Sequence, residues 1–498
     1  MKKIITVILD GLGISDNKEG NAVYHANMTN FNNLFNNYPH SLLEASGLKA
    51  GLPSDHFGNS EIGHTLIGAG RYIKQKDVII SEFLEKAYLE NETINKMLLN
   101  KEKTYHIMGL CSDGMVHSNI LHFLSLYDIL VASGVKKIYF HLITDGKDTN
   151  ASSAIKYIDK IKEVISINNV GEIATICGRF YAMDRDQNFD RTKIAYNLYT
   201  KGIGIYSEDI RDSLINSYEN GINDENIRPT IFNKEGIVND GDVVVWMNYR
   251  NDRSKQLVSA FVNPKFEGFP VLNMRNLELY TFFEIDSKIK TNNFIEFEEI
   301  KNPLGLYLAD LGLTQCRISE SEKIPHVTYF FDGGFEGKIE NCKKVEVPSL
   351  KLMNYKDKPE MSAVGVTKQV VKAIESDTDF ILVNFANPDI VGHTGDFEAT
   401  VRACMAVDIC LGKILEVADD NFYKVIVLSD HGNADKMLEE NGSLCKTHSS
   451  ALVPFIIKDN SISLEEKGAL YNVAPTILNY MDIRIPDEMS SSDSLLKD

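Results

Sequence analysis

The sequence predicts an α/β protein built around mainly parallel sheets. Short runs rich in β-branched residues recur along the 498-residue chain, and amphipathic helical patterns separate them. Runs of this length and composition are typical of strands that are buried on both faces, as in parallel sheets covered by helices. A chain this long exceeds one small core, so we expect two large domains.

Seven runs are the clearest strand candidates, because each is short, apolar and followed by turn residues. They occupy residues 4–9, 137–144, 173–177, 243–247, 380–385, 424–428 and 453–457. In the longer segments between them, apolar residues return every three to four positions, which predicts helices with one buried face. These helices are expected at residues 119–133, 154–165, 360–375 and 397–418.

Composition and charge exclude several classes of protein. Lys and Arg total 52 against 70 Asp and Glu, a net charge of −18, which disfavours non-specific binding to nucleic acid or to an anionic membrane. The apolar run at 4–9 is too short for a signal peptide, and no stretch approaches the roughly 20 apolar residues of a membrane span. Seven scattered cysteines without a C-x-x-C pair favour a reducing compartment. We therefore expect a cytoplasmic protein.

Polar residues follow six of the expected strands, where the sheets of α/β proteins bind their ligands. The residues at these six strand ends are Asp10, Asp145, Arg179, Arg250, Asp389 and Asp430. One Asp-Gly after a strand is explained by turn formation alone, but six such clusters are not. The clusters near both chain ends are rich in Asp and His, and those in the middle are rich in Arg and Lys. We expect one region to bind cations and the other to bind anions.

Three pairs of acids and imidazoles suggest a metal site. Asp389 and His393 lie four residues apart, on one face of a helical turn. Asp430 and His431 are adjacent after a strand, and His448 and Asp10 complete the set. A single buried His satisfied by an Asp is common, but the whole set suits Zn²⁺, Mn²⁺ or Co²⁺ better than Mg²⁺ or Ca²⁺. Its size fits about two ions.

A serine at the start of an expected helix, Ser60, is the candidate nucleophile, although an N-cap serine is the simpler explanation of that residue alone. Taken with further motifs along the sequence, the Ser60 segment shows that the chain resembles the cofactor-independent phosphoglycerate mutases of the alkaline phosphatase superfamily. The matching motifs follow the family's order at residues 7–13, 58–71, 112–118, 178–185, 319–328, 358–362, 384–395 and 430–435.

The resemblance implies an alkaline-phosphatase-like parallel-sheet domain, residues 1–72 and 298–498, with a second α/β domain inserted at 75–297. One metal ion would be held by Asp389, His393 and His448, and the other by Asp10, Ser60, Asp430 and His431. The substrate-binding residues would be His117, Lys147, Asp148, Arg179, Arg185, Arg250, Arg253 and Lys323. The implied cofactors are two divalent ions, Mn²⁺ first, without 2,3-bisphosphoglycerate. The family expectation is a monomer with a small-molecule substrate.

The implied reaction interconverts 3-phosphoglycerate and 2-phosphoglycerate, a step of glycolysis and gluconeogenesis, through a phosphoserine on Ser60. Asp148 and His117 would move protons on and off the glycerate oxygens. Three positions depart from the family pattern: Lys147 replaces an arginine, Asn251 replaces a proline between Arg250 and Arg253, and His64 is followed by Thr65 and Leu66. Two alternatives are a metal-dependent phosphatase or phosphopentomutase, which would share the metal ligands, and a non-catalytic interaction protein, which would have lost them.

Overall fold

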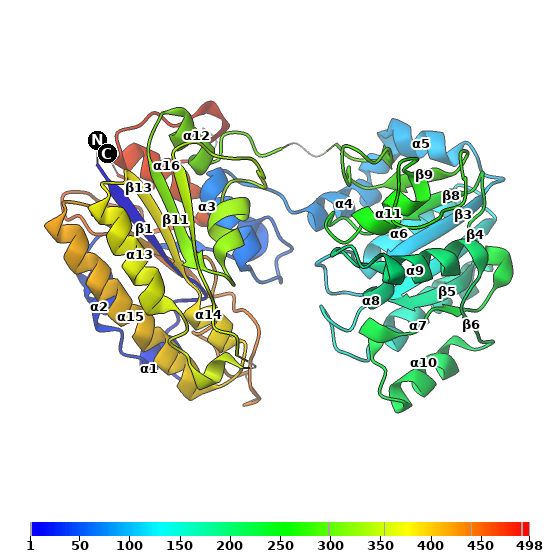
Figure 1. Ribbon diagram of the computed structural model, residues 1–498, viewed down its shortest axis with the longest axis horizontal. Helices are drawn as coiled ribbons and strands as arrows, with labels where there is room; N and C mark the ends of the chain where they lie inside the picture. Colours follow the sequence, from blue (N-terminus) through cyan, green and yellow to red (C-terminus); the bar gives the residue numbers. More distant parts are fainter. Residues whose placement is uncertain (1, 297–298, 353, 440, 490–491, 498) are drawn as a thin grey trace. The chain divides into compact units, whose positions relative to one another are not determined.

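The computed structural model describes residues 2–296, 299–352, 354–439, 441–489 and 492–497. It consists of two compact units (Figure 1). The first unit is Met1–Gln75 together with Glu299–Asp498, and the second is Lys76–Glu298. The boundary expected between residues 297 and 298 lies outside the described residues. Each unit holds one mixed, largely parallel sheet, which confirms the α/β fold class.

The sheet of the first unit has eight strands in the order β12-β11-β13-β1-β14-β15-β2-β16. Along the chain these are β1 (Ile4–Leu9), β2 (His40–Glu44), β11 (Gln315–Glu320), β12 (Cys342–Val347), β13 (Phe380–Phe385), β14 (Lys424–Leu428), β15 (Val453–Ile457) and β16 (Lys467–Ala469). From β12 to β14 all neighbours are parallel, and β15 pairs antiparallel with both β14 and β2.

Helices cover both faces of this sheet. On one face lie α1 (Ala22–His25), α2 (Thr29–Asn37), α13 (Ala363–Glu375) and α15 (Phe397–Asp420); on the other lie α3 (Ser60–Ala69), α12 (Leu304–Asp310) and α16 (Val473–Tyr480). Strand β1 shows why: Ile5, Val7 and Leu9 pack into the first core, and Ile4 and Ile8 into the second. A strand buried on both faces needs apolar residues at nearly every position.

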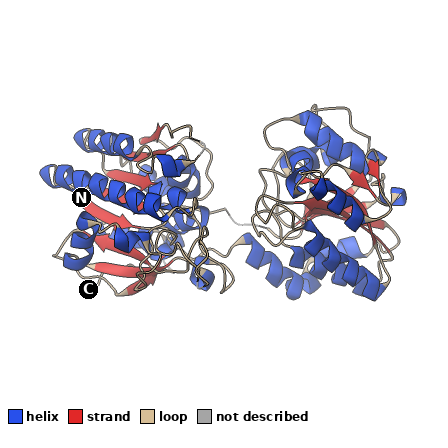
Figure 2. Cartoon of the chain, turned by 90° about the horizontal axis from the view of Figure 1, so that it is seen from below, coloured by secondary structure: helices blue, strands red, loops and turns tan. Residues whose placement is uncertain are grey.

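The second unit repeats this layering with strand order β10-β9-β8-β3-β4-β5-β7-β6. Its strands are β3 (Thr104–Leu110), β4 (Lys137–Thr144), β5 (Glu172–Gly178), β6 (Ile205–Tyr206), β7 (Thr230–Ile231), β8 (Val243–Trp246), β9 (Glu278–Thr281) and β10 (Asn292–Asn293). Its helices are α4 (Lys76–Glu85), α5 (Glu92–Leu98), α6 (Ile120–Ala132), α7 (Ala154–Asn168), α8 (Arg179–Ala182), α9 (Phe189–Lys201), α10 (Ile210–Glu219) and α11 (Lys255–Val262). In each unit the strands lie inside and the helices outside (Figure 2).

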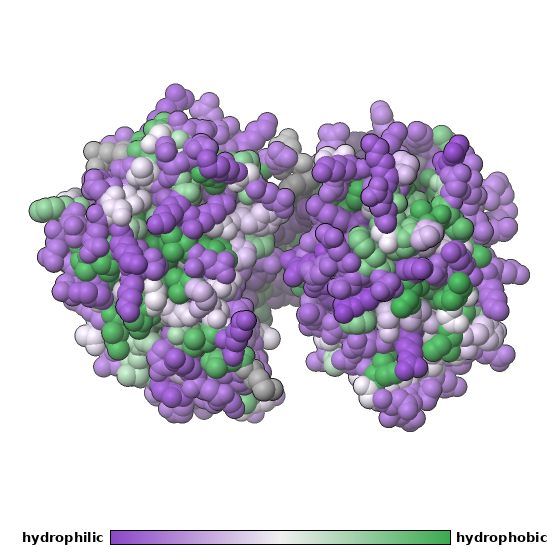
Figure 3. Space-filling view, viewed as in Figure 1, coloured by the Kyte–Doolittle hydropathy of each residue, from purple (hydrophilic) through white to green (hydrophobic). Residues whose placement is uncertain are grey.

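The surface shown in Figure 3 is largely hydrophilic in both units, with smaller groups of hydrophobic side chains between the polar ones. Among the described residues, no helix combines the length and apolar character that crossing a bilayer requires.

Candidate metal centre and anion-binding cluster

Three neighbouring parallel strands bring the acidic residues of the first unit together. In the register of the sheet, Leu9 of β1 lies opposite Phe385 of β13, and Ile8 lies opposite Leu428 of β14. Asp10, Asp389 and Asp430 therefore follow the same edge of the sheet, and all three are buried. Asp389 stands on the short helix α14 (Asn387–Gly392), which begins directly after β13 and ends next to His393.

Ser60 is the first residue of α3, as expected, but the helix cap is Asn59, whose side chain accepts a hydrogen bond from the Ile62 N–H. The Ser60 hydroxyl therefore does not cap the helix. It donates to Asp10 Oδ1 over 3.1 Å and lies 2.9 Å from His431 Nε2. A side chain at residue 63 would meet the Asp430 carbonyl at 2.7 Å, so Gly63 allows α3 to approach the sheet this closely.

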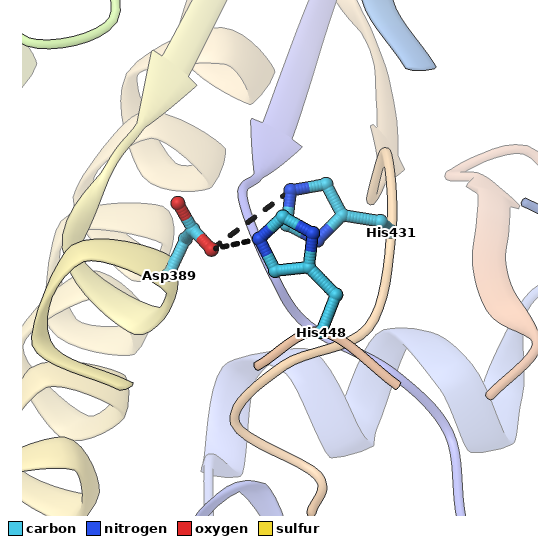
Figure 4. A group of neighbouring side chains, drawn as sticks. All are labelled: Asp389, His431 and His448. Carbon is cyan, nitrogen blue, oxygen red and sulfur yellow. Dashed lines mark ion pairs between the residues drawn. The ribbon is translucent and has the colours of Figure 1, made fainter. Parts of the chain in front are cut away.

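The histidines converge on Asp389. Asp389 Oδ1 lies 3.2 Å from His393 Nε2, 3.3 Å from His448 Nε2 and 3.9 Å from His431 Nε2. Figure 4 shows His431 and His448 turned toward the Asp389 carboxylate. The Nε2 atoms of His393 and His448 are only 3.1 Å apart. Imidazole nitrogens that approach one point in this way are typical of ligands to a shared cation.

The far side of each ring fixes its tautomer. The Nδ1 atoms of His393, His431 and His448 lie 2.8, 3.2 and 2.7 Å from backbone carbonyl oxygens. The accepting carbonyls belong to Lys446, Gly432 and Gly58, respectively. A carbonyl only accepts, so each Nδ1 carries a hydrogen and Nε2 is the nitrogen that faces the acids, where it can hold a proton or offer its lone pair to a metal ion. This is the outer arrangement that metal-ligating histidines use.

Lys323 lies among the acids rather than with the basic residues of the second unit. Its ammonium donates to Asp10 Oδ1, Ser60 Oγ and Asp389 Oδ2 over 2.8, 2.6 and 2.7 Å. Burial alone would lower its pKa, but the carboxylates of Asp10, Asp389 and Asp430 raise it. Burial opposes ionisation of Asp389 too, but Lys323 together with His393, His448 and His431 outweighs that cost and holds the Asp389 pKa well below its ordinary value.

The donor set fits divalent cations. Three buried carboxylates face one ammonium, which leaves an excess of negative charge, and Asp430 Oδ2 has no hydrogen-bond partner among the described residues. Burial lowers the pKa of His431, but Asp430 and Asp10 raise it to about 9. Such a site favours positive charge of either kind, a proton or a metal ion, at the same nitrogen.

In the second unit, acids hold arginines at the ends of β3, β4, β5 and β8. Arg179 Nη1 donates to Asp145 Oδ1 and Asp148 Oδ2, both over 2.6 Å. Ser112 Oγ donates to the other Asp145 oxygen, which fixes the carboxylate. Lys147, between the two acids, is exposed, and its backbone N–H donates to Asp145 Oδ1.

A second group of basic residues gathers around Asp252. Its two oxygens accept from Arg250 Nε over 3.1 Å and from Arg185 Nη1 over 2.8 Å, while Arg253 donates to the Met183 carbonyl. His117 is buried, and burial followed by the charges of Arg179 and Arg250 lowers its pKa to about 3. His117 is thus neutral at physiological pH, and the guanidinium groups of Arg179, Arg185, Arg250 and Arg253 supply positive charge that would attract an anion.

Among the described residues, the structure thus brings together Asp10, Ser60, Lys323, Asp389, His393, Asp430, His431 and His448 in the first unit. In the second unit it brings together Arg179 with Asp148 and, around Asp252, Arg185 with Arg250. Sequence reasoning missed Asn384, His64 and Asn433, which hydrogen-bond these side chains. An asparagine inside the otherwise apolar run 380–385 was the available signal, since a buried amide needs partners.

Residues 2–485 match the family model described as the Metalloenzyme superfamily. The chain is 40% identical over 510 aligned residues to a 2,3-bisphosphoglycerate-independent phosphoglycerate mutase of Clostridium novyi (strain NT), covering 100% of this chain and 99% of that one. A relative of the same name from Gracilaria tenuistipitata var. liui is 41% identical over 499 residues, with 98% of each covered. The crystal structure of Leishmania mexicana phosphoglycerate mutase at low cobalt concentration aligns with a TM-score of 0.80 and 27% identity, over 100% and 98% of the two chains.

Proposed function

The chain belongs to the 2,3-bisphosphoglycerate-independent phosphoglycerate mutase family, and from this premise we propose how its residues interconvert 3-phosphoglycerate and 2-phosphoglycerate. Ser60 is the nucleophile. The observation that carries this assignment is the position of Ser60 Oγ, between Lys323 Nζ at 2.6 Å and His431 Nε2 at 2.9 Å. At the first turn of α3, the helix dipole favours the negative charge of a phosphoryl group.

The metalloenzyme family and the cluster of acids and imidazoles imply use of divalent metal ions. Our proposal is two ions, with Mn²⁺ first, one on Asp389, His393 and His448 and the other on Asp10, Ser60, Asp430 and His431. When bound, such ions supply positive charge that lowers the pKa of a serine hydroxyl and stabilises phosphoryl oxygens. Imidazole and carboxylate together are the donors that Mn²⁺, Co²⁺ and Zn²⁺ accept.

In the forward direction Ser60 Oγ loses its proton and forms a bond to phosphorus, and the bond from phosphorus to the C3 oxygen breaks. The C3 oxygen takes up a proton, so glycerate leaves as the alcohol and Ser60 carries the phosphoryl group. The C2 hydroxyl of glycerate then loses its proton and forms the new bond to phosphorus, and Ser60 is released and takes up a proton. Each step exchanges one P–O bond for another, so atoms and charge balance without 2,3-bisphosphoglycerate.

The basic cluster of the second unit holds the substrate anion through Lys147, Arg179, Arg185, Arg250 and Arg253. Asp148 and His117, which lie 3.9 Å apart, move the protons on the glycerate oxygens. Retention of glycerate favours transfer over hydrolysis, because a held hydroxyl has an effective molarity of about 10⁵ M or more against about 55 M for water. The proposal includes a monomer in the cytoplasm that binds neither nucleic acid nor membrane; the seven free thiols support the reducing setting.

The test is an assay with 3-phosphoglycerate, coupled through enolase, without added bisphosphoglycerate. We expect 2-phosphoglycerate to form, chelation to stop the reaction, and Mn²⁺ to restore it better than Ca²⁺, which suits imidazole poorly. Release of inorganic phosphate without 2-phosphoglycerate would identify a phosphatase instead. Full recovery with Ca²⁺ alone would contradict the histidine ligands.

A further inference from the structure

A buried amide and a buried imidazole connect the nucleophile to a proposed metal ligand. Asn384 is the fifth of the six residues of β13 and His64 lies one helical turn after Ser60 in α3, and both side chains are fully buried. Asn384 Nδ2 lies 2.6 Å from Asp10 Oδ2 and 3.1 Å from His64 Nε2. On the far side of the ring, His64 Nδ1 lies 2.8 Å from the Ser60 carbonyl oxygen and 3.3 Å from Asp430 Oδ2.

The direction of each hydrogen bond that links Asp10, Asn384, His64 and the Ser60 carbonyl is determined. Asp10 is a carboxylate and only accepts, so the Asn384 atom that faces it must be the amide nitrogen. The second hydrogen of that nitrogen points to His64 Nε2, which is therefore the acceptor. His64 Nδ1 then carries the ring hydrogen and donates to the Ser60 carbonyl. Both ring nitrogens of His64 are then engaged in hydrogen bonds.

This arrangement distinguishes His64 from the histidines around Asp389. Those rings donate from Nδ1 to a backbone carbonyl and face the acids with Nε2, whereas the His64 lone pair is occupied by Asn384. One carboxylate oxygen each of Asp10 and Asp430 and one ring nitrogen of His64 lie within 4.8 Å of one another, close enough by distance alone to share an ion. The hydrogen-bond directions leave His64 no electron pair for that role.

Asn384 is not explained by packing alone. Its Oδ1 has no hydrogen-bond partner among the described residues, although it is buried, so the side chain leaves one polar atom unsatisfied. An apolar residue would fit the strand, whose other positions are Phe, Ile, Leu and Val. What the amide adds is a pair of donors directed to Asp10 and His64.

We propose that Asn384 and His64 are positioning residues that hold Asp10 and the Ser60 turn in register for the ion bound by Asp10, Ser60, Asp430 and His431. The inference rests on the proposed function only for that ligand set. Asn384 orients the carboxylate of Asp10, which directly follows β1. His64 orients the backbone carbonyl of Ser60 at the start of α3. The ion on Asp389, His393 and His448 does not depend on either contact.

The experiment measures Mn²⁺ binding alone, by competition with a chelator, in the full chain and in Asn384→Leu. The wild type should bind two ions. The variant should bind one of them about 10–100-fold more weakly, as is typical when the partner of a metal ligand is removed, and the other within about threefold. Turnover should show a matching fall in kcat with little change in KM, because the anion-binding residues are untouched.

Two further variants keep the test decisive if Asn384→Leu does not fold. His64→Asn retains an amide N–H near the Nδ1 position and so keeps the contact with the Ser60 carbonyl, whereas His64→Phe keeps the ring and loses every hydrogen bond. The phenylalanine variant should lose more Mn²⁺ affinity than the asparagine variant. Ser319→Ala is the matched control, since it removes a buried hydrogen bond to the Asn384 backbone carbonyl and leaves the amide in place.

Equal weakening of both ions, unchanged Mn²⁺ binding in Asn384→Leu, or the same loss in Ser319→Ala would overturn the inference. Such results with two ions bound to the wild type would leave the proposed function standing. A wild type that binds fewer than two ions would instead refute the proposed ligand sets and the inference with them.

Discussion

The two sites of this chain shift the pKa values of their histidines in different ways. In the first unit, carboxylates raise the pKa of His393 and His431 in spite of burial. In the second unit, burial lowers the pKa of His117, and Arg179 and Arg250 lower it further. The acidic site therefore favours positive charge at His393 and His431, whereas burial and the charge of His431 lower the pKa of the neighbouring His448. The basic site keeps His117 neutral.

Removal of the nucleophile should have the largest effect and should separate the chemistry of the first unit from the binding of the second. Ser60→Ala should lower turnover by about a thousandfold or more, because the acceptor oxygen for the phosphoryl group is lost. The fold should persist, as judged by circular dichroism, and no phosphoserine should form. Thr65→Ala, which removes a hydroxyl from the same helix, is the control. Turnover of Ser60→Ala within tenfold of wild type would refute the nucleophile assignment.

Loss of the two arginines that follow β8 tests the other side of the comparison. Arg250→Ala/Arg253→Ala should lower mutase activity about 100-fold, since hydrogen bonds to charged groups contribute roughly 1.5–3 kcal/mol each. Ser60 depends on the residues of the first unit, so part of the remaining flux should end as inorganic phosphate and glycerate. The measurement is the ratio of phosphate released to 2-phosphoglycerate formed.

The control for that variant is Arg211→Ala, which removes an exposed arginine paired with Asp159 elsewhere in the second unit. Its product ratio should match the wild type. If the double variant also keeps the wild-type ratio while both rates fall, the arginines position the incoming substrate and do not retain glycerate.

Acid should destabilise the second unit through its buried histidines. Burial lowers the pKa of His106 and His141, and lowers that of His122 to about 4. In the unfolded chain these groups titrate near 6.5, so below that pH the unfolded state binds more protons and stability falls with falling pH. The loss is about 1.4 kcal/mol per pH unit for each histidine that stays neutral in the folded state.

Trp246 in β8 reports this unit alone, because the chain has a single tryptophan. Its fluorescence in urea titrations should show a midpoint that falls steadily from pH 6.5 to pH 5 and stays level above pH 7. His122→Gln can keep a polar contact with Ser81. It should reduce the dependence of the free energy of unfolding on pH by the contribution of one histidine. A midpoint that does not change between pH 7 and pH 5 would show that these histidines are not neutral in the folded chain.

The smallest effect is expected at Lys147, which is exposed. Lys147→Arg should leave kcat similar or higher and lower the KM about threefold, because a guanidinium can hold an oxyanion through two parallel N–H donors. Steady-state kinetics with 3-phosphoglycerate measures both constants. A tenfold rise in KM would mean that the cluster is shaped around lysine.

The strands that were predictable are those whose side chains are apolar on both faces. The expected runs at 4–9, 137–144, 380–385, 424–428 and 453–457 coincide with strands at both ends. Strand β5 is one residue longer than expected at each end, and β8 ends one residue early. Strand β11 escaped prediction because it is buried but polar, with Gln315, Arg317 and Glu320 in a sequence of six. Its partners, such as Asp332 for Arg317, lie elsewhere in the chain, and no local pattern reveals them.

The candidate site shows the same division. Asp10, Asp389 and Asp430 could be placed near one another because each follows a parallel strand, and strand ends meet at one edge of the sheet. Lys323 was grouped with the substrate-binding residues by resemblance, and its three contacts with Asp10, Ser60 and Asp389 needed the coordinates. His64 and Asn384 were not predicted, since one lies in a helix and the other in a strand more than three hundred residues away.

The pairing of β1 has a consequence for synthesis on the ribosome. Ile4 of β1 lies between Phe380 of β13 and Lys424 of β14, so the first strand to be made waits for two of the last. At about 5–20 residues per second, that delay is tens of seconds. During it the whole of Lys76–Glu298 has been translated and can fold. The six residues of β1, five of them apolar, remain without a sheet throughout, which makes this segment a natural substrate for chaperones and an early route to aggregation.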